Sequence, residues 1–135
     1  PNTRSHQKKY FNEQIVGNKR IQFGIMSNIS KELIGVISLY SINLKNRDAF
    51  ISTFFNKKKK PIDSLNIFLE THQMLIDYGF KKMNLRRITS TTISKELDEL
   101  VCKILKFKSE GIMKQKVFNN NKYHDLYISS VFKKR

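Results

Sequence analysis

The sequence has one cysteine, few acidic residues and no long apolar run. The lone Cys102 excludes an internal disulfide framework and a cysteine-based zinc site. No stretch approaches the roughly 18 apolar residues that would span a bilayer, and we recognise no signal peptide at the start. We therefore expect a cytoplasmic protein with no membrane partner.

Several motifs of catalysis are also absent from the sequence. The histidines and carboxylates show no metal-ligand spacing, so no metal is predicted. There is no Walker-type loop, no nucleophile elbow and no Rossmann fingerprint.

The sequence has 26 lysines and arginines but only 11 aspartates and glutamates, which gives a formal net charge of +15. Such an excess favours a polyanionic partner, such as nucleic acid, a membrane surface or a phosphorylated cofactor. Most of the positive residues are lysines, however, and asparagine and isoleucine are also abundant, as the codons of an AT-rich genome would give. We attribute the total charge to composition, and we keep a functional interpretation for the run Lys57–Lys60.

The hydrophobic content of 39% and the ten phenylalanines favour a folded protein, and we expect one domain over residues 1–135. Its centre is the stretch Lys57–Phe80, in which four lysines and Pro61 precede apolar residues at helical spacing. The start of such a helix points backbone N–H groups and a positive dipole at one spot, which suits a phosphate.

Periodicity along the chain predicts the element order α-β-β-β-α-β-α-β-β. Ser94 is a good N-cap for the last helix, whose apolar stripe runs from Leu97 to Leu105, and Gly111 is expected to break the chain after it. The predicted helices are 6–16, 61–80 and 94–105, and the strands are 21–25, 33–40, 49–55, 85–93, 112–118 and 123–132, with a polar connection at 42–48. This order predicts an α/β or α+β fold with one mixed sheet of about six strands flanked by helices. The strands on either side of the central helix should be parallel.

Four stretches in this order resemble the GCN5-related N-acetyltransferase (GNAT) superfamily, within it the ribosomal-protein and amino-sugar acetyltransferase branch. The first two are Leu33–Leu39 with the loop 42–47, and the central helix with the strand after it. The others are Leu105–Gly111, similar to an "LGFKKEG" segment, and the closing hairpin 117–125. The family's usual first strand and helix are lacking before His6, as in a shortened or fragmentary member.

The resemblance implies that acetyl-coenzyme A binds at the loop and helix start that follow strand 49–55. It also implies acetyl transfer to a primary amine, on a small molecule such as an amino sugar or on a protein N-terminus. The cofactor-binding residues would be Phe54, Phe55, Lys59, Lys60, Asp63, Ser64, Leu65, Asn66, Ile67 and Phe68.

This chain departs from the family's pattern at the chemically important positions. Ser64, Asn66 and Phe68 stand where the family has the glycines of its pyrophosphate loop, so the loop is degenerate. Phe50 stands where a glutamate base is common, and Cys102 stands where a tyrosine acid is usual. The stretch before Asp63 is also about two residues longer than usual, and Lys95 replaces an asparagine.

The candidate catalytic residues that remain are Cys102 and His124. Cys102 could donate a proton, although a small residue on an amphipathic helix is the simpler interpretation. His124 and Asp125 could contact the acceptor substrate or form an exposed pair on the hairpin. His72, on the apolar stripe of the central helix, is interpreted as a core histidine and not as a base.

The leading hypothesis is therefore an acetyl-coenzyme A-dependent N-acetyltransferase. The alternative is a catalytically degenerate GNAT fold kept as a binding or scaffold module, and a nucleic-acid-binding protein ranks third because no recognition motif accompanies the charge. An incomplete sheet edge could pair with a second copy in a homodimer.

Overall fold

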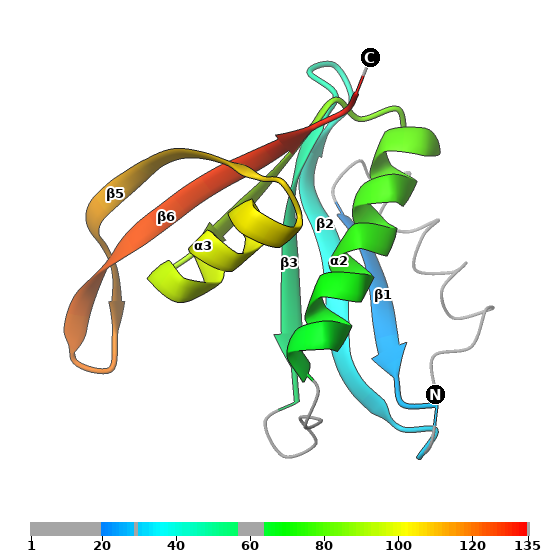
Figure 1. The fold of residues 1–135 in the computed structure, drawn as a ribbon, viewed down its shortest axis with the longest axis horizontal. Coiled ribbons are helices and arrows are strands. Elements are labelled where there is room, and N and C mark those ends of the chain that lie inside the picture. The colour runs from blue at the N-terminus through cyan, green and yellow to red at the C-terminus, as the bar shows by residue number, and fades with distance from the viewer. Residues whose placement is uncertain (1–19, 29, 57–63, 135) are drawn as a thin grey trace.

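A computed structural model describes residues 20–28, 30–56 and 64–134 of the chain. It confirms the predicted fold class: a six-stranded mixed sheet carries two helices (Figure 1). The elements are β1 (Arg20–Met26), β2 (Leu33–Asn43), β3 (Asp48–Phe55), α2 (Ser64–Lys81), β4 (Arg87–Thr92), α3 (Lys95–Ile104), β5 (Lys108–Asn119) and β6 (Lys122–Phe132). The predicted helix 6–16 and the run Lys57–Lys60 lie outside the described residues.

The strand order across the sheet is β1-β2-β3-β4-β6-β5. β1 with β2, β2 with β3, β4 with β6 and β5 with β6 are antiparallel. β3 and β4 pair in parallel, which confirms the prediction for the strands that flank the central helix. The sheet is therefore two antiparallel units joined through one parallel pair at its centre.

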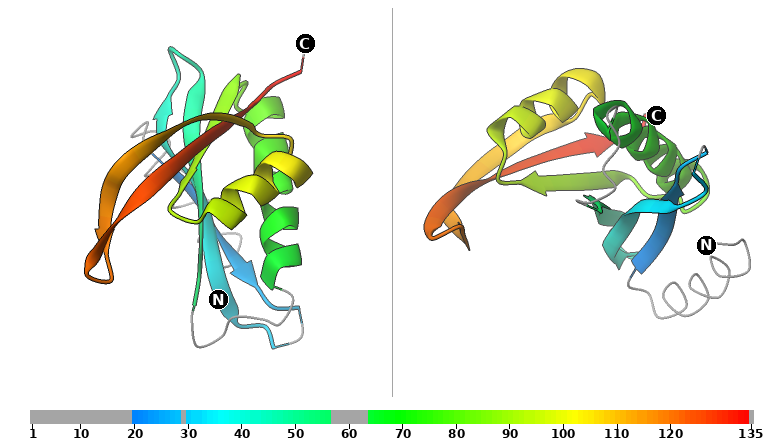
Figure 2. Two further views of the ribbon diagram at one scale, coloured as in Figure 1. Left: turned by 60° about the vertical axis from the view of Figure 1, so that its left-hand side comes forward. Right: turned by 90° about the horizontal axis from the view of Figure 1, so that it is seen from below.

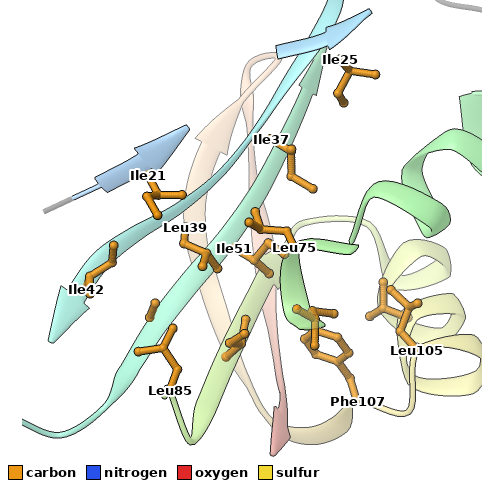
Figure 3. Close-up of a cluster of buried hydrophobic side chains, with 14 of the residues drawn as sticks. Ile21, Ile25, Ile37, Leu39, Ile42, Ile51, Leu75, Leu85, Leu105 and Phe107 are labelled. Atoms are coloured by element: carbon orange, nitrogen blue, oxygen red, sulfur yellow. The ribbon is translucent and has the colours of Figure 1, made fainter. Parts of the chain in front are cut away.

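Both described helices lie on the same face of the sheet (Figures 1 and 2). The apolar residues of alternating strand positions point to this face and form the core, together with Leu75 of α2 and with Leu105 and Phe107 after α3 (Figure 3). α2 packs closely enough that a Cβ added at Gly79 would lie 3.1 Å from Ile88 Cδ1 and 3.3 Å from Leu39 Cδ1.

The structure corrects three predictions about element boundaries. Gly111 does not break the chain, because it lies inside β5 at an irregular register with β6 and adopts a φ of +152° that favours glycine. Ile42 is not in a polar connection: β2 continues to Asn43 and buries Ile42 in the core. Leu85 is not in a strand, although it is fully buried in the connection before β4.

The predicted apolar stripe of α3 is only partly correct. Val101 and Leu105 are buried, but Ile104, the last residue of α3, is 48% exposed. The predicted N-cap is confirmed, since Ser94 Oγ accepts a hydrogen bond from the Leu97 N–H at 3.1 Å.

Candidate functional site

The central feature of the site is the point where β3 and β4 stop pairing. Their parallel ladder covers Asp48–Ile51 and Arg87–Ser90 and then ends. β3 continues to Phe55 paired with β2, and β4 continues to Thr92 paired with β6. The facing edges of residues 52–55 and 91–92 therefore diverge, as Figure 1 shows, and we call this place the β3–β4 split.

The end of β3 and the start of α2 lie at the same end of the molecule as the split (Figure 1). The first-turn N–H groups of α2 have no partners within the helix, and this turn contains no acidic side chain. Both features favour a negatively charged ligand.

The structure places seven of the ten predicted cofactor-binding residues around this point. Phe54 is 66% exposed, Phe55 is half-buried at the end of β3, and Ser64–Phe68 form the first turns of α2. Among the latter, Leu65 and Asn66 are exposed, whereas Phe68 is half-buried. Lys59, Lys60 and Asp63 lie outside the described residues.

His72 connects α2 to the free edge of β3. Its Nδ1 lies 3.1 Å from Thr53 Oγ1 and 3.0 Å from the Phe68 carbonyl oxygen, and its ring packs at a tilt against Phe68 with 3.9 Å between centroids. The side chain is 2% exposed, and burial lowers its pKa to about 4, against the weaker opposing effect of the Phe68 carbonyl. A neutral, buried imidazole at pH 7 is consistent with the interpretation of His72 as a core histidine.

The Cys102 side chain, on α3, lies close to two polar side chains: Asp98 of the same helix and Ser129 of β6. Burial and then the charge of Asp98 raise the pKa of the thiol, although the nearby Ser129 hydroxyl opposes the shift. Asp98 is 8% exposed and Ser129 is 0% exposed; within the described residues, Asp98 Oδ1 and Ser129 Oγ lack hydrogen-bond partners. A protonated thiol at pH 7 can donate a proton but is a poor nucleophile.

His124 lies in the outer part of the β5–β6 hairpin, past the last pair between β4 and β6 at Thr92 and Tyr127. Its Nε2 is 3.0 Å from the Asn119 carbonyl oxygen. The neighbouring Asp125 carboxylate accepts a hydrogen bond from the Gln115 N–H at 3.0 Å, which lowers its pKa. These contacts lie within the hairpin itself, and none of them joins His124 to Cys102.

A polar network that the sequence does not predict lies on the face of the sheet away from the two helices. The Arg87 guanidinium donates two hydrogen bonds to Glu110, at 2.6 and 2.7 Å, and a third to Ser130 Oγ at 3.0 Å. Ser130 also donates to Glu110 at 2.7 Å and lies 2.8 Å from Thr89 Oγ1. Arg87 lowers the pKa of Glu110, and Glu110 raises the pKa of Arg87. Arg87 and Glu110 are 23 positions apart, and Glu110 lies where the register between β5 and β6 shifts. Their contact therefore leaves no local signal in the sequence.

Phe50 shares this face of the sheet. It stacks on Tyr40 with 5.5 Å between ring centroids, and the Arg20 guanidinium lies 5.5 Å from the Tyr40 ring centre. Phe50 is therefore part of an aromatic stack on this face.

Neither a metal cluster nor a membrane-spanning helix is found among the described residues. No three His, Cys, Asp or Glu side chains in that part of the chain gather closely enough to hold a metal ion. Of the described helices, none combines the length and apolarity needed to cross a membrane.

Comparison with solved structures defines the class of fold. A probable acetyltransferase superposes with a TM-score of 0.76 at 24% identity, over 93% of this chain and 68% of that one. A dodecameric spermidine N-acetyltransferase from Vibrio cholerae superposes with a TM-score of 0.74 at 21% identity, over 95% of this chain and 73% of that one. The fold is that of the GNAT acetyltransferases.

Comparison of sequences agrees with this class, although no protein-family model matches the chain. The chain is 26% identical to the probable N-acetyltransferase YjcK of Bacillus subtilis over 90% of its own length and 66% of YjcK. It is 25% identical to the putative ribosomal N-acetyltransferase YdaF and 30% identical to the uncharacterized N-acetyltransferase YoaA of the same species, over 70% and 64% of their lengths. The chain thus spans about two thirds of the length of these relatives, and the matches support the GNAT superfamily.

Proposed function

We propose that this protein is an acetyl-coenzyme A-dependent N-acetyltransferase of the ribosomal-protein and amino-sugar branch, and that its acceptor is a primary amine. The observation that carries the proposal is the β3–β4 split beside the start of α2, in a fold shared with acetyltransferases. The names of the sequence relatives support the same activity.

The residues at the split suit coenzyme A. The pantetheine arm carries two amides, and the edge of β3 from Ser52 to Phe55 that β4 leaves unpaired offers backbone groups to such a chain. The N–H groups at the start of α2 suit the pyrophosphate, and Ser64 and Asn66 offer hydroxyl and amide donors where the family has glycines. Bound acetyl-coenzyme A would supply the activated acetyl group.

Acetyl transfer to an amine requires a neutral amine and a proton for the departing thiolate. We assign the proton donor to Cys102, because its thiol is protonated at pH 7 and lies beside two buried polar groups. Phe50 cannot act as a base, so in our proposal water removes the proton from the acceptor ammonium.

The release of free coenzyme A thiol, measured with a panel of amines, tests this function. An amino sugar and a peptide with a free N-terminus are the expected acceptors, and spermidine is included because the structural neighbour from Vibrio cholerae is a spermidine N-acetyltransferase. We expect saturable, amine-dependent thiol release. A folded protein that releases no thiol with any amine would contradict the proposal and support the degenerate binding or scaffold module.

Substitution of Cys102 tests the assigned proton donor. Cys102→Ala should lower kcat by about 10- to 100-fold with little change in KM, since general acid catalysis contributes roughly this much. The control is Ile104→Ala, an exposed position on the same helix, which should leave both constants unchanged. Equal activity of Cys102→Ala and the control would show that Cys102 only packs against the hydrophobic core.

A further inference from the structure

Seven positively charged residues gather at the end of the sheet opposite the split. They come from the β2–β3 turn, the α2–β4 connection and the chain after β6, and they are Lys45, Arg47, Lys81, Lys82, Arg86, Lys133 and Lys134. We call this surface the basic end. Six of the seven are exposed, and Arg47 is half-buried.

Backbone hydrogen bonds bring these three segments together. The Arg86 N–H donates to the Arg47 carbonyl at 2.7 Å, and the Lys133 N–H donates to the Arg86 carbonyl at 2.9 Å. The Lys133 ammonium also donates to Asn84 Oδ1 at 3.0 Å. Figure 1 shows the end of α2, the β2–β3 turn and the end of β6 at one end of the molecule.

The charge of the basic end is not neutralised by ion pairs. The ion pairs found among the described residues join Arg87 to Glu110 and Lys114 to Asp125, and neither uses one of the seven side chains. Asp48, at the start of β3, lies near Arg87, and Asp77 lies one turn before the end of α2; neither forms an ion pair with one of the seven side chains among the described residues. Like charges gathered on one surface repel one another and destabilise the fold. A polyanionic partner bound to this surface would remove that repulsion.

Overall lysine content does not explain this placement. The chain has six arginines, and two of them, Arg47 and Arg86, belong to the basic end. A compositional bias toward lysine would neither concentrate arginines nor choose one end of a sheet. Composition can account for the total net charge, but it does not account for the gathering of these seven residues at one end.

We infer that the basic end binds the phosphate backbone of a nucleic-acid duplex without reading its sequence. Lysine ammonium groups contact phosphates as point charges. The nearby Phe132 could stack on an unpaired base, but the Arg87 guanidinium already covers its ring at 4.8 Å. The surface thus offers charge for a backbone and no free aromatic platform for single-stranded bases.

Fluorescence anisotropy with labelled RNA and DNA duplexes of about 20 base pairs tests this inference. Binding should weaken steeply between about 50 and 200 mM NaCl, because phosphate contacts release counterions. The triple variant Arg86→Glu, Lys133→Glu, Lys134→Glu should bind at least ~10-fold more weakly, with a salt slope smaller by about 1 for each phosphate that is no longer bound. Acetyl-coenzyme A should not compete, because the split lies at the other end of the sheet; this separates the inference from the proposed function.

The control variant changes the net charge equally at exposed lysines elsewhere, as Lys95→Glu, Lys116→Glu and Lys122→Glu. It should retain affinity within about threefold, and both variants should melt cooperatively. Equal losses in the two variants would overturn the inference, since overall charge alone would then account for binding. Absence of duplex binding at 50 mM NaCl would also overturn it, as would charge-dependent binding to phosphatidylserine vesicles without duplex binding.

Discussion

At the scale of single residues, His72 makes the stability of this protein depend on pH. Its pKa of about 4 in the folded state lies below its ordinary value of 6.5, because burial disfavours the imidazolium. The unfolded chain therefore binds more protons between these values, and stability falls as the pH falls through this window. We expect the free energy of unfolding to drop by about 2 kcal/mol between pH 7 and pH 5, as urea titrations would measure.

His72→Gln removes this titration and keeps a polar group near Thr53, so its stability should change much less over the same pH range. His124→Gln, which alters the histidine in the outer part of the hairpin, should retain the wild-type slope. Equal slopes for wild type and His72→Gln would show that other groups cause the acid sensitivity.

The Arg87–Glu110 pair is the second residue-scale feature with a measurable consequence. Its two parallel hydrogen bonds link β4 to β5 across β6. Arg87→Lys keeps the charge but loses the planar guanidinium that makes two parallel hydrogen bonds to Glu110. We expect the free energy of unfolding to fall by about 1 kcal/mol, and no more because both side chains are partly exposed.

Lys114→Ala, which removes the single exposed contact with Asp125 at 3.3 Å, is the comparison and should cost close to nothing. If the urea midpoint of Arg87→Lys matched that of Lys114→Ala, the Arg87 network would not hold the hairpin to the sheet.

At the scale of elements, α3 depends on its N-terminal cap. Ser94 Oγ satisfies the Leu97 N–H, and Glu96 and Asp98 complement the positive end of the helix. Ser94→Ala should therefore cost about 1 kcal/mol of stability in thermal or urea unfolding. Ser109→Ala, at an exposed serine of β5, should cost a few tenths of a kcal/mol at most. Equal stability of the two variants would contradict the role of the cap.

The elements themselves could be predicted because their signals are local. Alternation in β1–β3, helical spacing in α2 and the cap of α3 lie within a few residues of one another. Gly111 misled the prediction because its local turn signal is overridden by pairing with Ile128 of β6. The fully buried Phe107 is hidden between the exposed Lys106 and Lys108, so no periodicity marks it as core.

The candidate site was predictable only in part. The order of β3, α2 and β4 predicts a ligand at the start of α2, and this stays a prediction; the split could not be predicted, because it depends on where the register between β3 and β4 ends. The contacts of His72 with Thr53 and of Arg87 with Glu110 depend on tertiary packing, which one sequence does not reveal.

At the scale of the whole molecule, one sheet presents two different ends. The split and the start of α2 lie at the carboxyl ends of β3 and β4, and the basic end lies where these strands begin. In our account a small cofactor and a large polyanion can therefore bind at the same time, and each can be tested without the other.

The measurement that tests the central claim most directly is a thermal melt of the protein over a range of acetyl-coenzyme A concentrations. A ligand that binds only the folded state adds about 2.7 kcal/mol at 100 times its dissociation constant, which raises the melting temperature by several degrees. The account predicts a concentration-dependent rise, which desulfo- and dephospho-analogues reproduce only partly. A cooperative melt that does not move at any concentration would contradict the claim that the β3–β4 split binds acetyl-coenzyme A.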